Sequence, residues 1–310
     1  MADWRYETAV PWTYYDSLYF SQITGGDLVY VIDRGATFYS YNLSTKVWTQ
    51  LASPTYVTAT GSSGLGIIDR NLYLSPNGTK IACVSEATNN HRGGKRIEIY
   101  TIATNTWVAS SQIQNMNDES GVSQAQCIAG LAWADEDTIW CWASEATTGV
   151  KDYVRCVKYT ISTDTFAPGS IKNGTLTYGS PTNAAINAAG TIIYGSVIGA
   201  TAREWYKYTI ATDTYASGGT LTSGRAFGYA ADQDKLWYFD TTTYRQGYLA
   251  TADASENDNQ FPENVNRTAG YGAYFGIKDD ISKIITLALS GTPWVMSYPV
   301  AAFIPKVCII

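Results

Sequence analysis

The segment Tyr100–Trp107 reads Tyr-Thr-Ile-Ala-Thr-Asn-Thr-Trp, and it returns at Tyr159–Phe166 as Tyr-Thr-Ile-Ser-Thr-Asp-Thr-Phe. Positions 100 and 159 differ by 59. The same difference of 59 separates the Ser-Glu-Ala-Thr sequence at Ser85–Thr88 from its copy at Ser144–Thr147. A spacing shared by two separate motifs indicates a repeated structural unit.

Two further copies of the eight-residue motif lie at Tyr41–Trp48 and Tyr208–Tyr215. Each copy predicts a strand, a polar turn and a second strand that opens near an aromatic residue. Tyr, Ile and Leu favour a pleated, half-buried surface. Ser, Thr, Asn and Asp favour the turn because their side chains bond nearby backbone groups.

A second element precedes each copy, in which a polar turn is followed by an apolar strand, as in Ser75–Val84 and Asn187–Tyr194. Turns of this kind between apolar runs indicate β-hairpins. They centre near residues 26, 78, 136, 189, 233 and 280. Units of about 40 to 50 residues rich in β-formers are typical of propeller blades. We therefore predict an all-β chain that forms a six-bladed β-propeller of four-stranded antiparallel blades.

The pattern Tyr-x-Ile/Leu-x-Thr-x-x-Trp after an apolar hairpin resembles the kelch repeat, and the hairpin at Ser75–Ala82 is similar to that of TolB-type propellers. Both resemblances imply the propeller fold over nearly the whole chain. Neither supplies catalytic residues that could be transferred by position.

We expect a single domain over 1–310, because the repeat shows no break. The predicted blades span roughly 15–54, 62–112, 123–170, 182–220, 224–265, and 268–310 plus 1–14. The leftover N-terminal segment Trp4–Val10 is predicted to pair into the last blade and close the ring, which removes two exposed sheet edges.

Charged residues make up 15% of the 310 residues, whereas Tyr (24) and Trp (10) are abundant. Packing between stacked sheets explains this richness, and a sugar- or protein-binding surface is the alternative. The net charge of −6 argues against nucleic-acid binding. The densest basic segment, Arg92–Arg96, is expected to be a solvated loop.

The N-terminal residues lack the apolar core of a classical signal peptide. No segment reaches the roughly 18 apolar residues of a membrane span, so we expect no membrane insertion. The five cysteines have no CxxC spacing, which argues against a zinc site or a disulfide framework. Cys141 and Cys156 fall on adjacent predicted strands, as buried thiols or as a disulfide.

Loop length distinguishes the two faces of the predicted disc. Turns joining strands one to two and three to four are short, whereas the connections on the opposite face are long, namely 86–96, 110–126, 145–153, 167–183 and 253–268. Binding residues usually lie on long loops of a rigid scaffold.

Six residues of these loops are the candidate ligand-binding residues: Glu86, His91, Arg92, Asp118, Glu119 and Glu145. Glu86 and Glu145 open equivalent loops of neighbouring blades. Two such carboxylates suit a metal ion or acid/base chemistry, and the alternative is that each satisfies backbone amides of its own loop. His91 is the sole histidine, so a multi-histidine metal site is excluded.

Asp253, Glu256 and Asp258 cluster in a predicted Asn-rich loop before Phe261. Oxygen-rich loops can hold Ca²⁺, but this spacing matches no known calcium loop. We predict no cofactor, with Ca²⁺ at these residues as the alternative.

The composition favours a non-catalytic propeller used for assembly or attachment, as in a phage capsid accessory, tail or fibre protein. Few charges and abundant Thr, Tyr, Asn and Gly are typical of virion proteins. The expected partners are other structural proteins, with a cell-surface glycan as the alternative. The expected location is a virion or the extracellular space, or alternatively the cytoplasm. The two alternative functions are a carbohydrate- or protein-binding receptor module and a propeller glycosidase or polysaccharide lyase.

Overall fold

The computed structural model describes residues 3–6, 11, 18–33, 37–55, 72–86, 95–111, 125–146, 152–174, 181–198, 203–221, 224–230, 235–240, 245–250, 255–260, 275–277, 283–287 and 293–297. These residues form β-strands and one short 3-10 helix, η1 (Ile210–Thr212). Among them, no helix has both the length and the apolar character needed to cross a lipid bilayer. The all-β prediction is confirmed.

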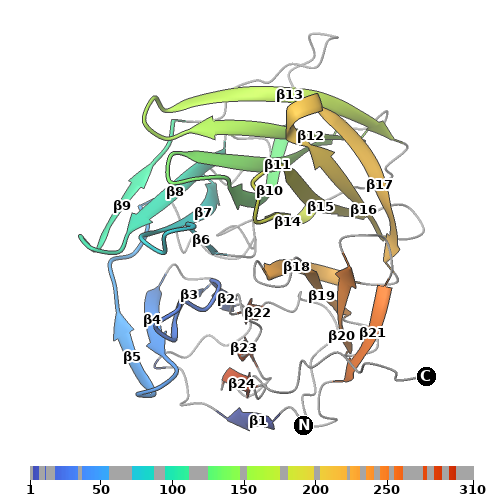
Figure 1. The fold of residues 1–310 in the computed structure, drawn as a ribbon. Coiled ribbons are helices and arrows are strands. Elements are labelled where there is room, and N and C mark those ends of the chain that lie inside the picture. The colour runs from blue at the N-terminus through green and yellow to red at the C-terminus, as the bar shows by residue number, and fades with distance from the viewer. Residues whose placement is uncertain are drawn as a thin grey trace, which may run out of the picture.

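The strands form four-stranded antiparallel sheets (Figure 1), which we number I to VI in chain order. Sheet I contains β2 (Leu18–Phe20), β3 (Leu28–Asp33), β4 (Phe38–Asn42) and β5 (Val47–Gln50). Sheet II contains β6 (Tyr73–Leu74), β7 (Lys80–Glu86), β8 (Lys95–Thr101) and β9 (Thr106–Ala109). Sheet III contains β10 (Ala125–Trp133), β11 (Thr138–Ala146), β12 (Asp152–Thr160) and β13 (Thr165–Gly174).

Sheet IV contains β14 (Pro181–Ile186), β15 (Ile192–Ile198), β16 (Arg203–Thr209) and β17 (Thr214–Leu221). Sheet V contains β18 (Gly224–Ala230), β19 (Lys235–Asp240), β20 (Arg245–Ala250) and β21 (Ser255–Gln260). Sheet VI contains β22 (Phe275–Ile277), β23 (Lys283–Leu287), β24 (Pro293–Ser297) and β1 (Asp3–Tyr6).

Sheet VI combines the two ends of the described chain. β1 pairs antiparallel with β24, so that Asp3 lies opposite Ser297 and Tyr6 opposite Trp294. The predicted pairing of the N-terminal segment with the last sheet is therefore present. β1 is therefore the fourth strand of sheet VI, whereas each of sheets I to V consists of four strands that are consecutive in the chain.

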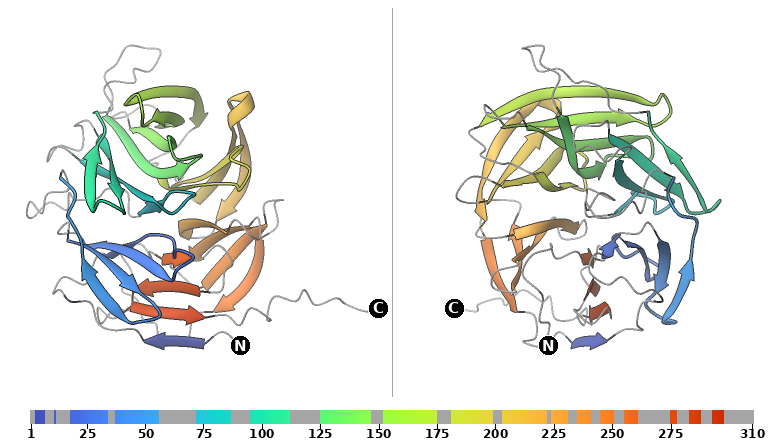
Figure 2. Two further views of the ribbon diagram at one scale, coloured as in Figure 1. Left: turned by 60° about the vertical axis from the view of Figure 1, so that its left-hand side comes forward. Right: turned by 180° about the vertical axis from the view of Figure 1, so that it is seen from behind.

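Each sheet lies against the next along the chain (Figure 2). The first strands of consecutive sheets are in contact, as β10 with β14, β14 with β18 and β18 with β22. β2 of sheet I also contacts β22 and β23 of sheet VI. The strand beginning each sheet thus lies innermost, and the fourth strand lies at the periphery.

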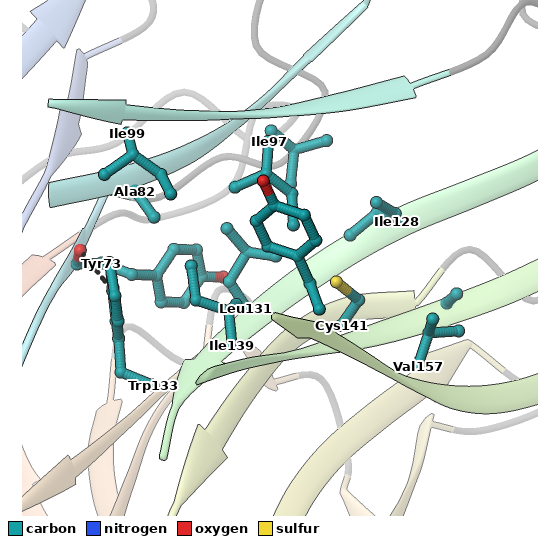
Figure 3. Close-up of a cluster of buried hydrophobic side chains, with 13 residues drawn as sticks. Tyr73, Ala82, Ile97, Ile99, Ile128, Leu131, Trp133, Ile139, Cys141 and Val157 are labelled. Carbon is teal, nitrogen blue, oxygen red and sulfur yellow. Dashed lines mark hydrogen bonds between the residues drawn. The ribbon is translucent and has the colours of Figure 1, made fainter. Parts of the chain in front are cut away.

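Both faces of a sheet are buried where it packs between two neighbours. One apolar cluster joins sheets I and II, a second joins sheets II and III (Figure 3), and a third joins sheets III and IV. In the second cluster, Val84 and Ile97 of sheet II meet Leu131, Cys141 and Val157 of sheet III. This packing explains why β7 and β11 are almost continuously apolar rather than alternating.

Large aromatic side chains fill the spaces between sheets and require glycine opposite them. Between sheets III and IV, a Cβ atom built on Gly195 would lie 2.3 Å from Trp142. Within sheet IV, a Cβ atom on Gly218 of β17 would lie 2.3 Å from Trp205 of β16. Every described Trp, Tyr and Phe side chain is buried or partly buried. These aromatics therefore serve packing, as the favoured interpretation of the composition predicted.

Cys83, Cys141 and Cys156 are buried thiols that form no disulfide. Cys156 lies opposite Trp142 and faces sheet IV, whereas Cys141 faces sheet II. Burial raises the pKa of the Cys156 thiol well above its ordinary value. The disulfide alternative for Cys141 and Cys156 is therefore wrong, because the two side chains project from opposite faces of one sheet.

Two predicted loops are partly strand. β13 continues to Gly174 and so takes up the first part of the predicted loop 167–183. β21 covers Ser255–Gln260, so Glu256 and Asp258 lie on a strand and not in the loop predicted over 253–268. Pairing with β20 overrides the turn preference of the Asn and Asp residues in this segment.

Candidate functional site

One end of the sheets carries the turns between the first and second and between the third and fourth strands. We call this end the turn face, and the opposite end the loop face. In sheets I to IV, the turns between the third and fourth strands cover only residues 43–46, 102–105, 161–164 and 210–213. The prediction that these turns are short is confirmed for these four sheets.

The last residue of each such turn has a left-handed backbone. The φ angles are 62° at Lys46, 52° at Asn105, 49° at Asp164 and 50° at Asp213. Asn and Asp tolerate this conformation better than most residues do. In sheets II to IV, the Asn or Asp that ends the turn therefore favours the backbone conformation that the turn requires.

The side chains of Asn105, Asp164 and Asp213 connect neighbouring sheets, and we call them the clasp residues. Asp213 accepts hydrogen bonds from the Tyr208 hydroxyl at 2.6 Å and from the backbone N–H of Ser170 in sheet III at 2.8 Å. Asp164 accepts from the Tyr159 hydroxyl and from the Ser111 N–H of sheet II, both at 2.9 Å.

Asn105 makes the same two contacts, with the Tyr100 hydroxyl and with the Ala52 N–H of sheet I, both at 2.9 Å. Each clasp residue therefore fixes a turn of one sheet to the sheet before it. Asn105 and Asp164 bond to the backbone just after the outer strand of that sheet, and Asp213 bonds to the outer strand β13 itself.

Burial and hydrogen bonding in the clasps shift the pKa values of Tyr159, Tyr208 and Asp213. Burial and the hydrogen bond to the aspartate raise the pKa of both Tyr159 and Tyr208. Burial by itself raises the pKa of Asp213, but the hydrogen bonds from Tyr208 and Ser170 outweigh burial and leave it below its ordinary value. The ionised carboxylate is therefore the form that the clasp stabilises.

A second connection lies closer to the inner strands. Glu136, in the turn before β11, accepts hydrogen bonds from the Asn77 N–H at 2.9 Å and the Thr79 hydroxyl at 2.8 Å. Its backbone carbonyl accepts a 2.7 Å hydrogen bond from Lys80 Nζ. Burial raises the pKa of Glu136, but these contacts outweigh it and the net shift is downward. The side chains of Glu136 and of the three clasp residues therefore connect neighbouring sheets at the turn face.

Two predicted candidates lie at the loop face. Glu86 ends β7, and Glu145 is the penultimate residue of β11. They are not at equivalent positions. In sheet II, Glu86 pairs with Lys95. The residue 59 positions after Lys95 is Val154 of β12, and it pairs with Ser144 rather than with Glu145. The Ser-Glu-Ala-Thr repeat is therefore shifted by one residue against the strand register, although both residues precede the connection between the second and third strands of their sheets.

The shift places the two positions beside one gap. Ala82 and Val84 of β7, and Cys141 and Ala143 of β11, all belong to the cluster between sheets II and III. Alternate positions of a strand share a face. Position 86 thus belongs to the face of sheet II that meets sheet III, and position 145 belongs to the face of sheet III that meets sheet II.

Most of the other candidates fall where the structure describes no residues. His91, Arg92, Asp118, Glu119 and Asp253 lie outside the described residues. The predicted basic loop 92–96 is partly strand, because β8 begins at Lys95 and Arg96 donates to the Ser110 carbonyl at 2.7 Å. Within the described ranges, no three His, Cys, Asp or Glu side chains are grouped so as to hold a metal ion.

Sequence reasoning missed the buried carboxylate of Glu98. This residue of β8 is 0% exposed and accepts a 2.7 Å hydrogen bond from the Thr55 N–H at the end of sheet I. Within Arg96–Tyr100 the charges alternate with isoleucines, a pattern typical of a solvent-facing edge. Packing of sheet I over this face buries Glu98 instead.

The clasps were also missed, although the sequence carries a signal for them. A Tyr lies five positions before each clasp residue: Tyr100 before Asn105, Tyr159 before Asp164, and Tyr208 before Asp213. The same spacing separates Tyr248 from Asp253.

No protein-family model matches the chain, and no curated protein matches it. The similar solved structures share little sequence with it. TolB from Acinetobacter baumannii superposes with a TM-score of 0.54 at 12% identity, covering 89% of this chain and 65% of TolB. This chain therefore spans slightly less than two thirds of TolB.

A chain in the crystal structure of the mitotic checkpoint complex superposes with a TM-score of 0.53 at 9% identity, covering 96% of this chain and 93% of the other. Virginiamycin B lyase from Staphylococcus aureus gives a TM-score of 0.53 at 10% identity, covering 96% and 100%. These structures are β-propellers. This chain has a propeller-like fold. A relationship to kelch proteins in particular is not shown.

Proposed function

We propose that this chain is a non-catalytic, protein-binding β-propeller that acts as a structural component of an assembly, with the virion as its setting. We further infer that sheets I to VI are the six blades of one closed ring and one domain, with β1 completing the last blade. Contacts of β2 with β22 and β23 support the closure.

The clasps carry the proposal. They fix sheets I to IV to one another at the turn face, so the side chains of the clasp residues are already used in holding the sheets together. The connections of the loop face are left to meet a partner, as is usual for long loops on a rigid scaffold. The partner we propose is another structural protein.

Lysine cross-linking of the native assembly tests this proposal. Lys95 begins β8 at the loop face, and Lys46 lies exposed in a turn of the turn face. We expect Lys95 to lose reactivity or to cross-link to a partner in isolated particles, while Lys46 reacts as in the free chain. Protection of Lys46 alone, or recovery of the protein only as a free monomer, contradicts the proposal.

A second candidate is the propeller glycosidase or lyase, favoured by one observation. Positions 86 and 145 border the same gap between sheets II and III, and paired-carboxylate catalysis needs a separation of about 5 to 10 Å. Turnover of a polysaccharide panel that disappears in the Glu86→Gln and Glu145→Gln variants supports this candidate, and turnover that both variants retain removes it. The carbohydrate-receptor alternative finds no support in the described residues, because their aromatic side chains are not exposed.

A further inference from the structure

The outer strands β5 and β9 each pair on one side only. β5 bonds to β4 and β9 bonds to β8, and both lie at the periphery in Figure 1. Among the described residues, no strand covers their outer edges. Such an edge is a template for pairing with another chain unless charge, proline or a bulge protects it.

Sheets III, V and VI carry this protection on their outer strands. β13 contains Pro168 and Lys172, β21 contains Glu256 and Asp258, and β1 contains Asp3 and Arg5. In sheet IV, β17 contains the Gly218–Gly219 pair beside a bulge, which weakens a strand as a pairing template.

β5 and β9 have no charge, proline or bulge, and their protection is limited to their shortness, at four residues each. Their sequences are Val-Trp-Thr-Gln and Thr-Trp-Val-Ala, without charge, proline or glycine. They also carry the large hydrophobic side chains that are exposed in the described part of the chain, Val47 at 53% and Val108 at 67%. Val108 lies within its strand, opposite Ile99, whereas Val47 is the first residue of β5, beside the turn.

We infer that β9 is a self-association edge, at which the β9 strands of two copies of this chain pair antiparallel about a two-fold axis. The occupant is a second copy because β9 carries no charged residue, so it can lie beside an identical strand without placing like charges opposite each other. A two-fold arrangement makes the same patch serve both copies. The pairing would satisfy the free backbone groups of both strands and bring the two Val108 side chains together. This inference does not depend on the partner proposed for the loop face.

The test is the association state of the full chain, measured by sedimentation velocity against concentration. We expect the native protein to form a dimer and Val108→Lys to raise the dimer dissociation constant at least about tenfold, because it places two like charges side by side. Val47→Lys is the matched control, since it adds the same charge to the neighbouring outer strand and should leave dimerisation unchanged.

A cross-linking variant covers the case in which Val108→Lys does not fold. Val108→Cys should form a covalent dimer on mild oxidation, and Val47→Cys should not. The inference is overturned if the native chain stays monomeric up to about 100 µM. It is overturned equally if Val108→Lys dimerises as the native chain does, or if both cysteine variants cross-link to the same extent.

Discussion

Removing the side chain of one clasp residue tests whether the clasps hold the sheets together. In Asp213→Ala, the Tyr208 hydroxyl loses an acceptor at 2.6 Å and the Ser170 N–H loses one at 2.8 Å. The substitution also puts a residue with no polar side chain into a left-handed backbone, with φ 50° and ψ 45°.

Two effects contribute to the expected cost. A hydrogen bond to a charged group contributes about 1.5 to 3 kcal/mol, but Asp213 is exposed, so we take about 2 kcal/mol for both bonds together. A left-handed backbone costs about 1 kcal/mol for a residue such as alanine. The free energy of unfolding should therefore fall by about 3 kcal/mol in Asp213→Ala.

Two further variants separate these effects. Asp213→Gly removes the hydrogen bonds but accepts the backbone conformation, so it should lose about 2 kcal/mol. Asp213→Asn keeps an acceptor oxygen and tolerates the left-handed backbone. It should lose less than about 1 kcal/mol, since Asn105 makes the same two contacts in sheet II.

Equilibrium urea unfolding, followed by tryptophan fluorescence, measures the three differences. The reasoning is refuted if Asp213→Ala and Asp213→Asn unfold at the same urea concentration. It is refuted equally if Asp213→Gly is as stable as the native protein, because the clasp bonds then contribute nothing.

Three further predictions concern the pH dependence of the Asp213 clasp, the packing at Gly195 and the burial of Glu98. Folding lowers the pKa of Asp213, so its contribution to the free energy of unfolding is fully present above the unfolded pKa near 3.8 and is lost as the pH falls through the folded pKa. Unfolding curves from pH 6 to pH 2 should therefore show the native protein losing its extra stability over Asp213→Asn. Gly195→Ala should destabilise by about 3 kcal/mol or prevent folding, because its Cβ would overlap Trp142, whereas Gly25→Ala, with nothing within 4 Å, should unfold near the native temperature. Glu98→Leu should lose about 1 kcal/mol because the Thr55 N–H loses its buried acceptor, while Glu98→Gln, which keeps an acceptor, should lose less; equal urea midpoints for the two would contradict this.

Much of the fold could be predicted because its signals are local. The motif at Tyr100–Trp107 places apolar residues on both sides of a polar four-residue turn, and the structure forms β8, the turn and β9 there. The pairing of the N-terminal segment with the last sheet followed from counting strands. In the fifth and sixth sheets, β19 and β23 begin just after the turn centres predicted near residues 233 and 280.

The candidate site was less accessible from sequence. Two identical Ser-Glu-Ala-Thr copies indicated equivalent positions, but the register of β7 and β11 differs by one residue. A one-residue difference moves a position to the other face of its sheet. The repeat therefore could not show which faces Glu86 and Glu145 belong to.

The sequence by itself determined the elements whose information lies within a few neighbouring residues: strands, short turns and the left-handed residue that ends each turn. Only the tertiary structure decided which sheet face meets which. It buried Glu98 beneath sheet I, turned Cys141 and Cys156 to opposite sides, and bonded Asp164 and Asp213 to the preceding sheet. A strand carries the same alternation of side chains whether water or another sheet covers its face, so burial is settled only when the sheets pack.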